Sequence, residues 1–281
     1  MDKRKLLILM IIILFTNITC IGKDMHKQNY IFPSINDIQE SSWEKMSGYK
    51  IYFGHQSVGY NIIDGIEDIL KENDKIHLNI VETDDAKDFI APLFGHSRVG
   101  RNTQPISKVD AFSSFIEDGI GDKADLVFFK FCYIDFNAES DINKIFNYYK
   151  AKMSYLKEVY PKTTFVHVTV PLKTCQTGLK AAVKKILGKP LWGYDDNIKR
   201  NQFNDLLRKE YGKEKMLFDL ALIESTFPDG SRNVHQKDGQ SFHSLVPAYT
   251  YDGGHLNEKG RRIVAEQLLI FLANLLTEKN I

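Results

Sequence analysis

Three side chains that could together activate an alcohol stand at two distant places in the sequence. Ser57 lies in the polar turn 54–59 (GHQSVG), after the apolar residues 51–53 (IYF) and before apolar residues that recur at helical spacing. Asp252 and His255 stand three apart, separated by two glycines. Such an aspartate can hold one imidazole nitrogen and leave the other to take a proton from the serine. The pattern indicates nucleophilic attack on an acyl group.

The place of Ser57, between an expected strand and an expected helix, suits this chemistry. The first N–H groups of a helix have no partner inside the helix and can stabilise an oxyanion. A serine at this place is also a common helix N-cap, and Asp252 and His255 taken singly also suit an exposed loop. The three residues together, at these positions, favour a catalytic triad.

Strands and helices alternate along the chain. The pattern predicts a three-layer α/β/α sandwich with a mostly parallel five-stranded sheet, whose carboxyl edge binds the ligand. We expect strands at 51–53, 76–81, 126–131, 165–170 and 216–219, and helices at 34–46, after Ser57, and at 142–160, 197–211 and 265–276.

Some segments do not follow this alternation. Residues 84–111 form a long polar stretch, which favours a functional loop, and residues 172–196 are expected to cover one side of a pocket. Lys130 interrupts an apolar run, and we expect its amine to reach water from the strand end, with a direct role in the site as the alternative. His167 is expected to be a hydrogen-bonded core histidine.

The N-terminal residues have the pattern of an export signal. Three basic residues precede an apolar run from Leu6 to Phe15, and Cys20 follows in a context that resembles the lipobox of bacterial lipoproteins. We therefore expect a signal peptide at 1–20, a tether at 21–33 and one domain at 34–281. Lipidation of Cys20 would place the protein on a membrane of the bacterial envelope or periplasm; a cleaved signal and an uncleaved anchor stay open. Cys132 and Cys175 are expected to be buried thiols.

Composition narrows the classes of partner and cofactor. The chain has 281 residues, 43% of them hydrophobic, and a net charge of +1, so it can bury a sizeable core and gives no sign of nucleic-acid binding. A zinc site is an alternative use of His235, His243, Asp252 and His255, which fall within twenty-one residues, but their spacing matches no recognised motif. We expect neither a metal nor a cofactor.

The order of these elements resembles the SGNH (GDSL-like) hydrolase superfamily. A serine after the first strand and Asp-x-x-His before the last helix are its triad, and His55-Gln56-Ser57 in place of the usual GDS resembles an atypical branch of exported proteins. The resemblance implies a flavodoxin-like sandwich, with Ser57 as nucleophile, His255 as base and Asp252 as its orienter. The implied oxyanion donors are Gly100, Asn102 and Gln56. The usual asparagine after the third strand is absent, and Ile134 stands in its place.

The resemblance and the leader together imply an exported serine esterase or deacylase. Its substrates would be acylated carbohydrates or other small esters, with O-acetyl groups on glycans as the first choice. Two alternatives remain: an O-acyltransferase with the same triad, and a non-catalytic glycan-binding lipoprotein that retains the fold. The missing asparagine favours the second alternative, whereas Ser57, Asp252 and His255 argue against it.

Overall fold

A computed structural model describes residues 30–278 of the chain, so the predicted signal peptide, Cys20 and most of the predicted tether lie outside the described residues. Six parallel strands form the central sheet in the order β2-β3-β1-β4-β5-β6. Without the edge strand β2, this is the flavodoxin-like order. The strands are β1 (Lys50–His55), β2 (Ile80–Glu82), β3 (Leu93–Arg98), β4 (Leu126–Phe129), β5 (Thr164–Val168) and β6 (Leu217–Phe218).

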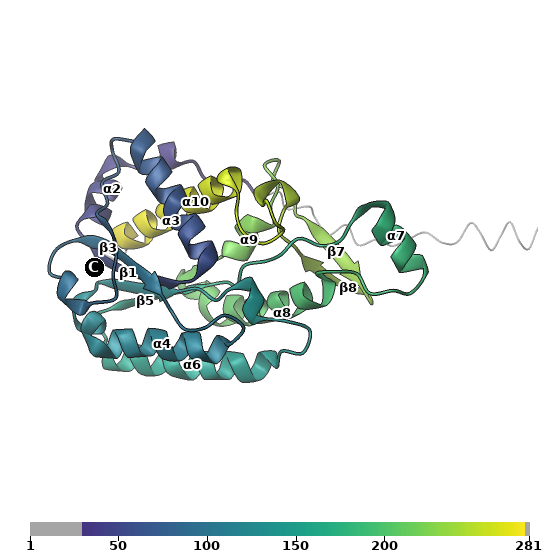
Figure 1. Ribbon diagram of the computed structural model, residues 1–281. Helices are drawn as coiled ribbons and strands as arrows, with labels where there is room; N and C mark the ends of the chain where they lie inside the picture. Colours follow the sequence, from purple (N-terminus) through teal and green to yellow (C-terminus); the bar gives the residue numbers. More distant parts are fainter. Residues whose placement is uncertain (1–29, 279–281) are drawn as a thin grey trace, which may run out of the picture.

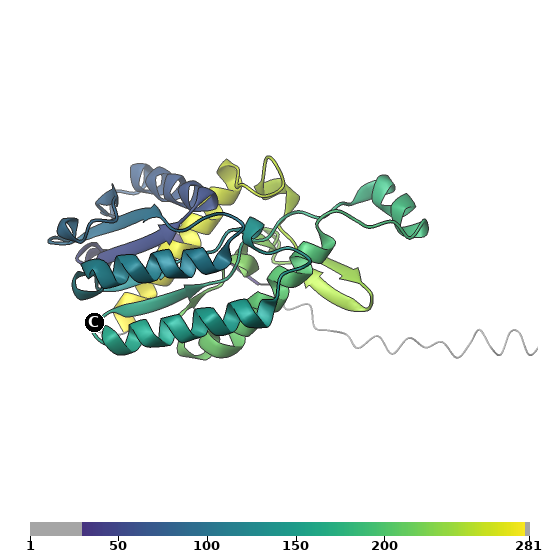
Figure 2. The ribbon, with the colours of Figure 1, turned by 60° about the horizontal axis from the view of Figure 1, so that its bottom comes forward.

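Helices cover both faces of this sheet, which confirms the predicted three-layer sandwich (Figures 1 and 2). One face carries α2 (Glu40–Ser47), α3 (Ser57–Glu72) and α10 (Glu258–Glu278), and the other carries α4 (Pro105–Phe115), α6 (Ile142–Val159) and α8 (Tyr194–Tyr211). The other elements are α5 (Gly121–Lys123), α7 (Gly178–Ile186), α9 (Leu220–Glu224), the hairpin β7 (Val234–Lys237) and β8 (Gln240–His243), a π-helical segment (Ile116–Ile120), and 3-10 turns at Ile35–Asp37, Ala86–Asp88, Tyr133–Asp135, Gly212–Glu214 and Pro247–Tyr249.

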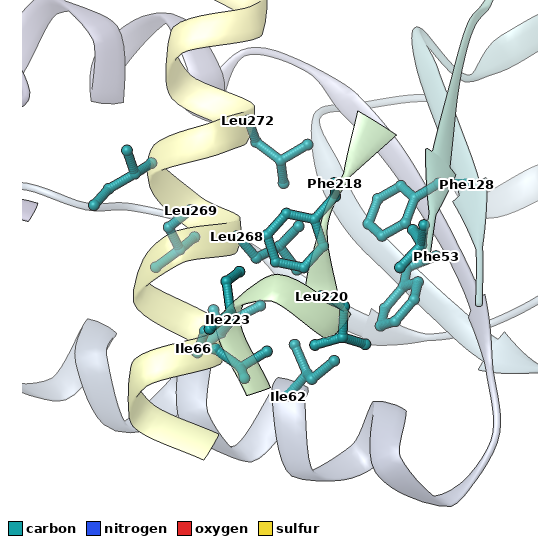
Figure 3. Close-up of a cluster of buried hydrophobic side chains, with 14 of the residues drawn as sticks. Phe53, Ile62, Ile66, Phe128, Phe218, Leu220, Ile223, Leu268, Leu269 and Leu272 are labelled. Atoms are coloured by element: carbon teal, nitrogen blue, oxygen red, sulfur yellow. The ribbon is translucent and has the colours of Figure 1, made fainter. Parts of the chain in front are cut away.

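Alternate residues of the central strands enter two separate cores. Ile51 and Phe53 of β1 pack in the core beneath α3 and α10, whereas Tyr52 between them packs in the core beneath α4 and α6. Successive side chains of a strand point to opposite faces, so a strand covered on both faces must be apolar throughout. Phe53 and Phe128 stack at 4.6 Å between ring centroids in the first core, which Figure 3 shows.

The contact between α3 and α10 brings the two ends of the domain together. Figure 3 shows Ile66 of α3 beside α10 and Ile62 pointing toward Leu220 in the same core. Gly65 permits the close approach, because a Cβ atom there would lie 2.5 Å from the carbonyl oxygen of Arg261. Arg261 also pairs with Asp68 at 2.6 Å. The helix that begins at Ser57 is therefore fixed against the helix that follows His255.

The sheet has six strands where the sequence predicted five, because β3 was missed within the expected loop at 84–111. Residues 95–97 (GHS) of this strand are not apolar, and yet all three are buried. Ser97 bonds to the Tyr52 hydroxyl at 2.8 Å, and His96 bonds to His55 at 3.0 Å. These partners satisfy the polar groups that β3 places in the interior. The loop prediction was wrong here, and it also missed α4.

Other elements differ from their predictions in extent. The strand expected at 76–81 is confined to β2, and the helix expected at 34–46 is a 3-10 turn followed by α2. Lys130 does not reach water, because its side chain is fully buried. His167 is buried and bonds to the Tyr149 hydroxyl at 2.6 Å, as predicted.

Two further features belong to residues 30–278. No helix in this part of the chain has the length and apolar character needed to cross a membrane. Cys132 and Cys175 are buried free thiols, as predicted.

Candidate active site

Ser57 is the first residue of α3 and stands two residues after the carboxyl end of β1. The preceding Gln56 is extended and serves as the N-cap without a side-chain capping bond. Gly59 allows the tight turn, because a Cβ atom there would lie 2.1 Å from Cγ of His55. Ser57 is therefore half-buried at a helix N-terminus, where backbone N–H groups face outward from the helix.

His55, two residues before Ser57, is a structural group. Its Nδ1 atom lies 3.0 Å from the carbonyl oxygen of Gln56, so Nδ1 must carry the proton. Its Nε2 atom then accepts from Nδ1–H of His96 at 3.0 Å. Burial, reinforced by the nearby Lys130 charge, lowers the pKa of His55 to about 3. With both ring nitrogens engaged, His55 holds the turn and leaves the role of base to another residue.

His255 and Asp252 lie in the loop between the last 3-10 turn and α10. Oδ2 of Asp252 lies 2.6 Å from Nδ1 of His255, while Oδ1 accepts from the N–H groups of Gly254 and His255 at 2.9 and 2.8 Å. Partial burial favours the neutral acid, but these hydrogen bonds outweigh it and lower the pKa of Asp252 to about 2. Asp252 is thus ionised and orients His255 so that Nε2 is the free nitrogen.

A hydrogen bond ties this loop to the helix of Ser57. The N–H group of Leu256 donates to Oδ1 of Asn61 at 3.1 Å. Asn61 lies one helical turn after Ser57, and Leu256 directly follows His255. The loop that carries Asp252 and His255 is therefore bonded to the helix that begins with Ser57.

Ser57 and His255 line one cavity of about 420 Å³. It opens at the carboxyl ends of β1 and β3, where ligands bind in open α/β sheets. Its walls are Gln56, Ser57, Tyr60, Asn61, Arg98, Asn102, Tyr251 and His255. A cavity of about 520 Å³ lies beside the amino end of β5 and is lined by Ser154 and His167, but Nδ1 of that histidine bonds to the Tyr149 hydroxyl at 2.6 Å rather than to a carboxylate. The candidate active site is the cavity beside Ser57.

The predicted oxyanion donors differ in their surroundings. The side-chain amide of Gln56 donates to the carbonyl oxygens of Val99 and Gly100 at 3.0 and 2.9 Å, so both of its N–H bonds are engaged. Gly100 has a φ of +57° and does not line the cavity. A Cβ atom there would lie 2.6 Å from the backbone of Lys108, so the position needs glycine. Gln56 and Gly100 therefore shape the turn beside Ser57.

Asn102 also lines the cavity, and its side chain is held through its oxygen rather than through its amide N–H groups. Its Oδ1 atom accepts from Nζ of Lys108 at 3.1 Å. The oxygen is thus fixed by Lys108, and the NH₂ group is the part of the side chain that can donate to a ligand. Lys108 is fully buried and pairs with Asp135 at 2.6 Å. Asp135 also accepts from the N–H groups of Thr103 and Cys132 at 2.9 and 2.7 Å. Asp135 therefore organises the loops after β3 and β4, and Lys108 orients Asn102.

Tyr133 packs over His255 from the loop after β4. Its hydroxyl lies 3.4 Å from Nδ1 and 3.5 Å from Nε2, and the two rings meet edge to face. Gly254 makes room for it, because a Cβ atom there would lie 2.7 Å from the phenol ring. Burial, with the Asp252 charge, raises the pKa of Tyr133 to about 12, so it stays a neutral phenol. Ile134, at the place of the missing asparagine, is partly exposed.

Four further residues of the cavity were not among the predicted site residues: Tyr60, Asn61, Arg98 and Tyr251. Arg98 ends β3, donates from Nε to the Tyr60 hydroxyl at 3.1 Å and stacks on the Tyr60 ring at 5.3 Å. Tyr60 in turn donates to Glu82. The position of Arg98 at the sheet edge could not be predicted because β3, the strand that it ends, was missed. Recognition of that strand would have placed Arg98 and Ser57 at the same edge of the sheet.

The described residues contain no group of three or more His, Cys, Asp or Glu side chains that could hold a metal ion. His235 and His243 lie on the hairpin β7–β8, where His235 bonds to the Ser244 hydroxyl at 2.9 Å. These two histidines therefore lie on a different element from Asp252 and His255, whose side chains bond to each other at 2.6 Å.

Comparison with known proteins found similar solved structures. This chain is similar to a protein described as a platelet activating factor from Streptococcus pneumoniae, with 14% identity, a TM-score of 0.47, and coverage of 85% of this chain and 94% of that one. It is also similar to a protein described as a lipolytic protein of the G-D-S-L family from Desulfitobacterium hafniense, with 10% identity, a TM-score of 0.45, and coverage of 79% and 99%. A third is the periplasmic domain of a lipopolysaccharide acetyltransferase from Salmonella ser. Paratyphi A, with 12% identity, a TM-score of 0.44, and coverage of 79% and 83%.

No family model and no curated protein matches the chain. The order of the strands in this structure is the flavodoxin-like order that the resemblance to the SGNH (GDSL-like) superfamily implies.

Proposed function

We propose that this protein is a serine esterase or deacylase that acts on O-acyl esters, with O-acetyl groups on glycans as its first class of substrate. One observation carries the proposal: Ser57 at a helix N-terminus and His255 line the same cavity, and Asp252 holds Nδ1 of His255 at 2.6 Å. A binding site alone would need no such set of groups.

In the proposed reaction, Nε2 of His255 takes the proton of the Ser57 hydroxyl as Oγ attacks the ester carbon. The N–H group of Ser57 and the side-chain amide of Asn102 stabilise the oxyanion, because both residues line the cavity. His255 then returns the proton to the leaving alcohol, and an acyl group remains on Ser57. Water activated by His255 releases the acid and restores the serine.

The choice of a glycan substrate is supported by the superfamily resemblance and by the aromatic rings beside the site. The side chains of Trp192 and Tyr251 are 50% and 69% exposed, and Tyr251 lines the cavity. Exposed rings of this kind offer flat apolar faces to a ligand. The same acyl-enzyme could pass its acyl group to a sugar hydroxyl in place of water, which would make the protein an O-acyltransferase.

The decisive experiment compares hydrolysis of p-nitrophenyl acetate by the wild type and by Ser57→Ala. We expect turnover by the wild type, background rates for Ser57→Ala, and labelling of the wild type alone by a fluorophosphonate probe. Ser154→Ala, which changes an exposed serine of α6, is the matched control and should behave as the wild type. Equal background rates in the wild type and Ser57→Ala would favour the glycan-binding alternative. Acyl transfer that outpaces hydrolysis when an oligosaccharide is added would favour the transferase.

We also propose that the protein is exported and anchored by a lipid on Cys20. The support is the basic start, the apolar run and the position of Cys20 in the sequence. In cells, Cys20→Ser should shift the protein from the membrane fraction to the soluble fraction and prevent incorporation of labelled palmitate. An unchanged distribution with no palmitate in the wild type would contradict lipidation.

A further inference from the structure

The segment between β5 and α8 leaves the body of the domain and carries α7 at its far end. Figures 1 and 2 both show α7 standing away from the central sheet and its covering helices. The base of this excursion is fixed, because Thr174 N–H donates to the Gly253 carbonyl at 2.9 Å and Gln176 N–H donates to the Trp192 carbonyl at 3.0 Å. The excursion is thus an ordered arm that begins beside the loop of Asp252 and His255.

One side of α7 is apolar and exposed. Leu179, Val183, Ile186 and Leu187 follow the spacing i, i+4, i+7 and i+8, which places them on one stripe of a helix. Their side chains are 87%, 55%, 85% and 61% exposed. Single exposed apolar residues are ordinary, whereas a contiguous stripe on a protruding element marks a surface that binds something.

The same arm is strongly basic. Residues 171–194 contain five lysines and no aspartate or glutamate, although the whole chain has a net charge of only +1. Lys180, Lys185 and Lys189 are exposed on or beside α7. Lys184 is partly buried and donates to Gln176 at 3.1 Å. The surface of the arm therefore combines exposed apolar side chains with positive charge.

We propose that α7 lies in the plane of an anionic lipid bilayer, with its apolar stripe in the headgroup region and its lysines on the lipid phosphates. A short helix with an apolar stripe and a lysine-rich polar side suits this position. A second copy of the chain suits it less well, because a two-fold interface would bring identical lysine clusters against each other. Charge complementarity therefore favours the anionic surface.

This contact would act together with the candidate active site. Lys173 lies at the base of the arm. Its Nζ atom is 5.1 Å from the ring centroid of Tyr133 and 4.9 Å from the ring centroid of Trp192. Tyr133 in turn packs on His255. An arm that rests on a bilayer would hold the cavity near the membrane surface, so esters attached to that surface would be within reach.

The test places an environment-sensitive NBD probe on α7 through Ile186→Cys. The full-length chain carries Cys20→Ser, so that neither a lipid nor a label occupies position 20, and Cys132 and Cys175 are buried. Ile90→Cys is the matched control, because Ile90 and Ile186 are 83% and 85% exposed. With phosphatidylglycerol-containing vesicles, we expect a blue shift and quenching by brominated lipid for the probe at 186 and neither change at 90.

Charge variants test the electrostatic part. Replacement of Lys180, Lys185 and Lys189 by Gln should weaken partitioning of the probe at 186 on the order of a hundredfold, because each lysine near an anionic surface contributes several-fold. The matched control replaces three exposed lysines of the body by Gln and should leave partitioning of the probe unchanged: Lys144, Lys162 and Lys213.

Three results would overturn the proposal. The first is an unshifted probe at 186 with anionic vesicles, and the second is equal partitioning into pure phosphatidylcholine vesicles. The third is a blue shift without vesicles that grows with protein concentration, which would assign the stripe to self-association. All of these readouts are independent of esterase activity, so they stand apart from the test of Ser57. Thermal unfolding of each variant verifies that the body remains folded.

Discussion

Asp252 and His255 form a hydrogen bond of 2.6 Å within a loop whose backbone N–H groups hold the same carboxylate. This loop is attached to α3 through the bond between Asn61 and Leu256. The orientation of the imidazole is therefore set by local contacts and by the helix that begins at Ser57.

Asp252→Asn tests this relationship. An amide can present its NH₂ group to His255 and favour the wrong tautomer, so we expect kcat for p-nitrophenyl acetate to fall about 10⁴-fold. Asp74→Asn, which changes an exposed aspartate in the turn after α3, should have no effect. Retention of most activity in Asp252→Asn would show that another group orients His255.

The depressed pKa of Asp252 also fixes a direction for pH dependence. Its folded pKa of about 2 lies below the ordinary aspartate value of about 3.9, so its contribution to stability is complete above the ordinary value and is lost as pH falls toward 2. Asp252→Asn should therefore reduce the part of the acid destabilisation between about pH 4 and pH 2. Urea unfolding at these pH values measures the difference.

Asn102→Ala tests the oxyanion assignment. Removal of one oxyanion donor costs about 10²–10³-fold in kcat, and KM should change little because the interaction strengthens in the transition state. Gln56→Ala is the informative comparison, since the Gln56 amide bonds to Val99 and Gly100 and its loss should lower stability as well as rate. A normal kcat in Asn102→Ala would show that backbone N–H groups alone stabilise the oxyanion.

The ion pair between Lys108 and Asp135 is fully buried, so removal of one partner leaves a charge without compensation. We expect Asp135→Leu to lower the free energy of unfolding by about 3–5 kcal/mol. The double variant Lys108→Met with Asp135→Leu should recover much of this loss, because it removes both charges. Urea unfolding of both variants measures the coupling. Equal loss in the single and double variants would show that the hydrogen bonds of Asp135 to Thr103 and Cys132 dominate.

The elements that follow a simple period could be predicted from the sequence. β1 and β4 are apolar because both faces of the sheet are covered, and the helices bury one face each. Ser57, Asp252 and His255 were recognisable because they occupy turns at the ends of such elements. The structure adds that Ser57 and His255 line the same cavity.

The features that were missed depend on distant partners. Ser97 and His96 are buried in β3 only because Tyr52 and His55 of the neighbouring strand bond to them. Lys130 is buried beside Cys132, 3.9 Å from its sulfur, although its neighbours in sequence favoured a side chain that reaches water. No local pattern reveals such pairings, because the compensating group lies on another element.

Glu224 provides the last prediction. Its side chain is fully buried, Oε2 accepts from Leu172 N–H at 2.7 Å, and Oε1 has no hydrogen-bond partner within residues 30–278. Burial raises the pKa of Glu224 to about 8, against the opposing effects of the Leu172 bond and the charges of Lys130 and Arg200. The folded protein therefore keeps a proton that the unfolded chain loses near the ordinary glutamate value of about 4.3.

A carboxyl group with a raised folded pKa makes stability fall as pH rises between its unfolded and folded values. The wild type should lose stability between about pH 5 and pH 8 relative to Glu224→Gln, whose amide oxygen can still accept from Leu172 without titrating. Glu44→Gln, on the exposed side of α2, should retain the wild-type slope. Urea unfolding at successive pH values gives the comparison, and parallel stability profiles for the wild type and Glu224→Gln would show that Glu224 is already ionised in the folded protein, held by Lys130.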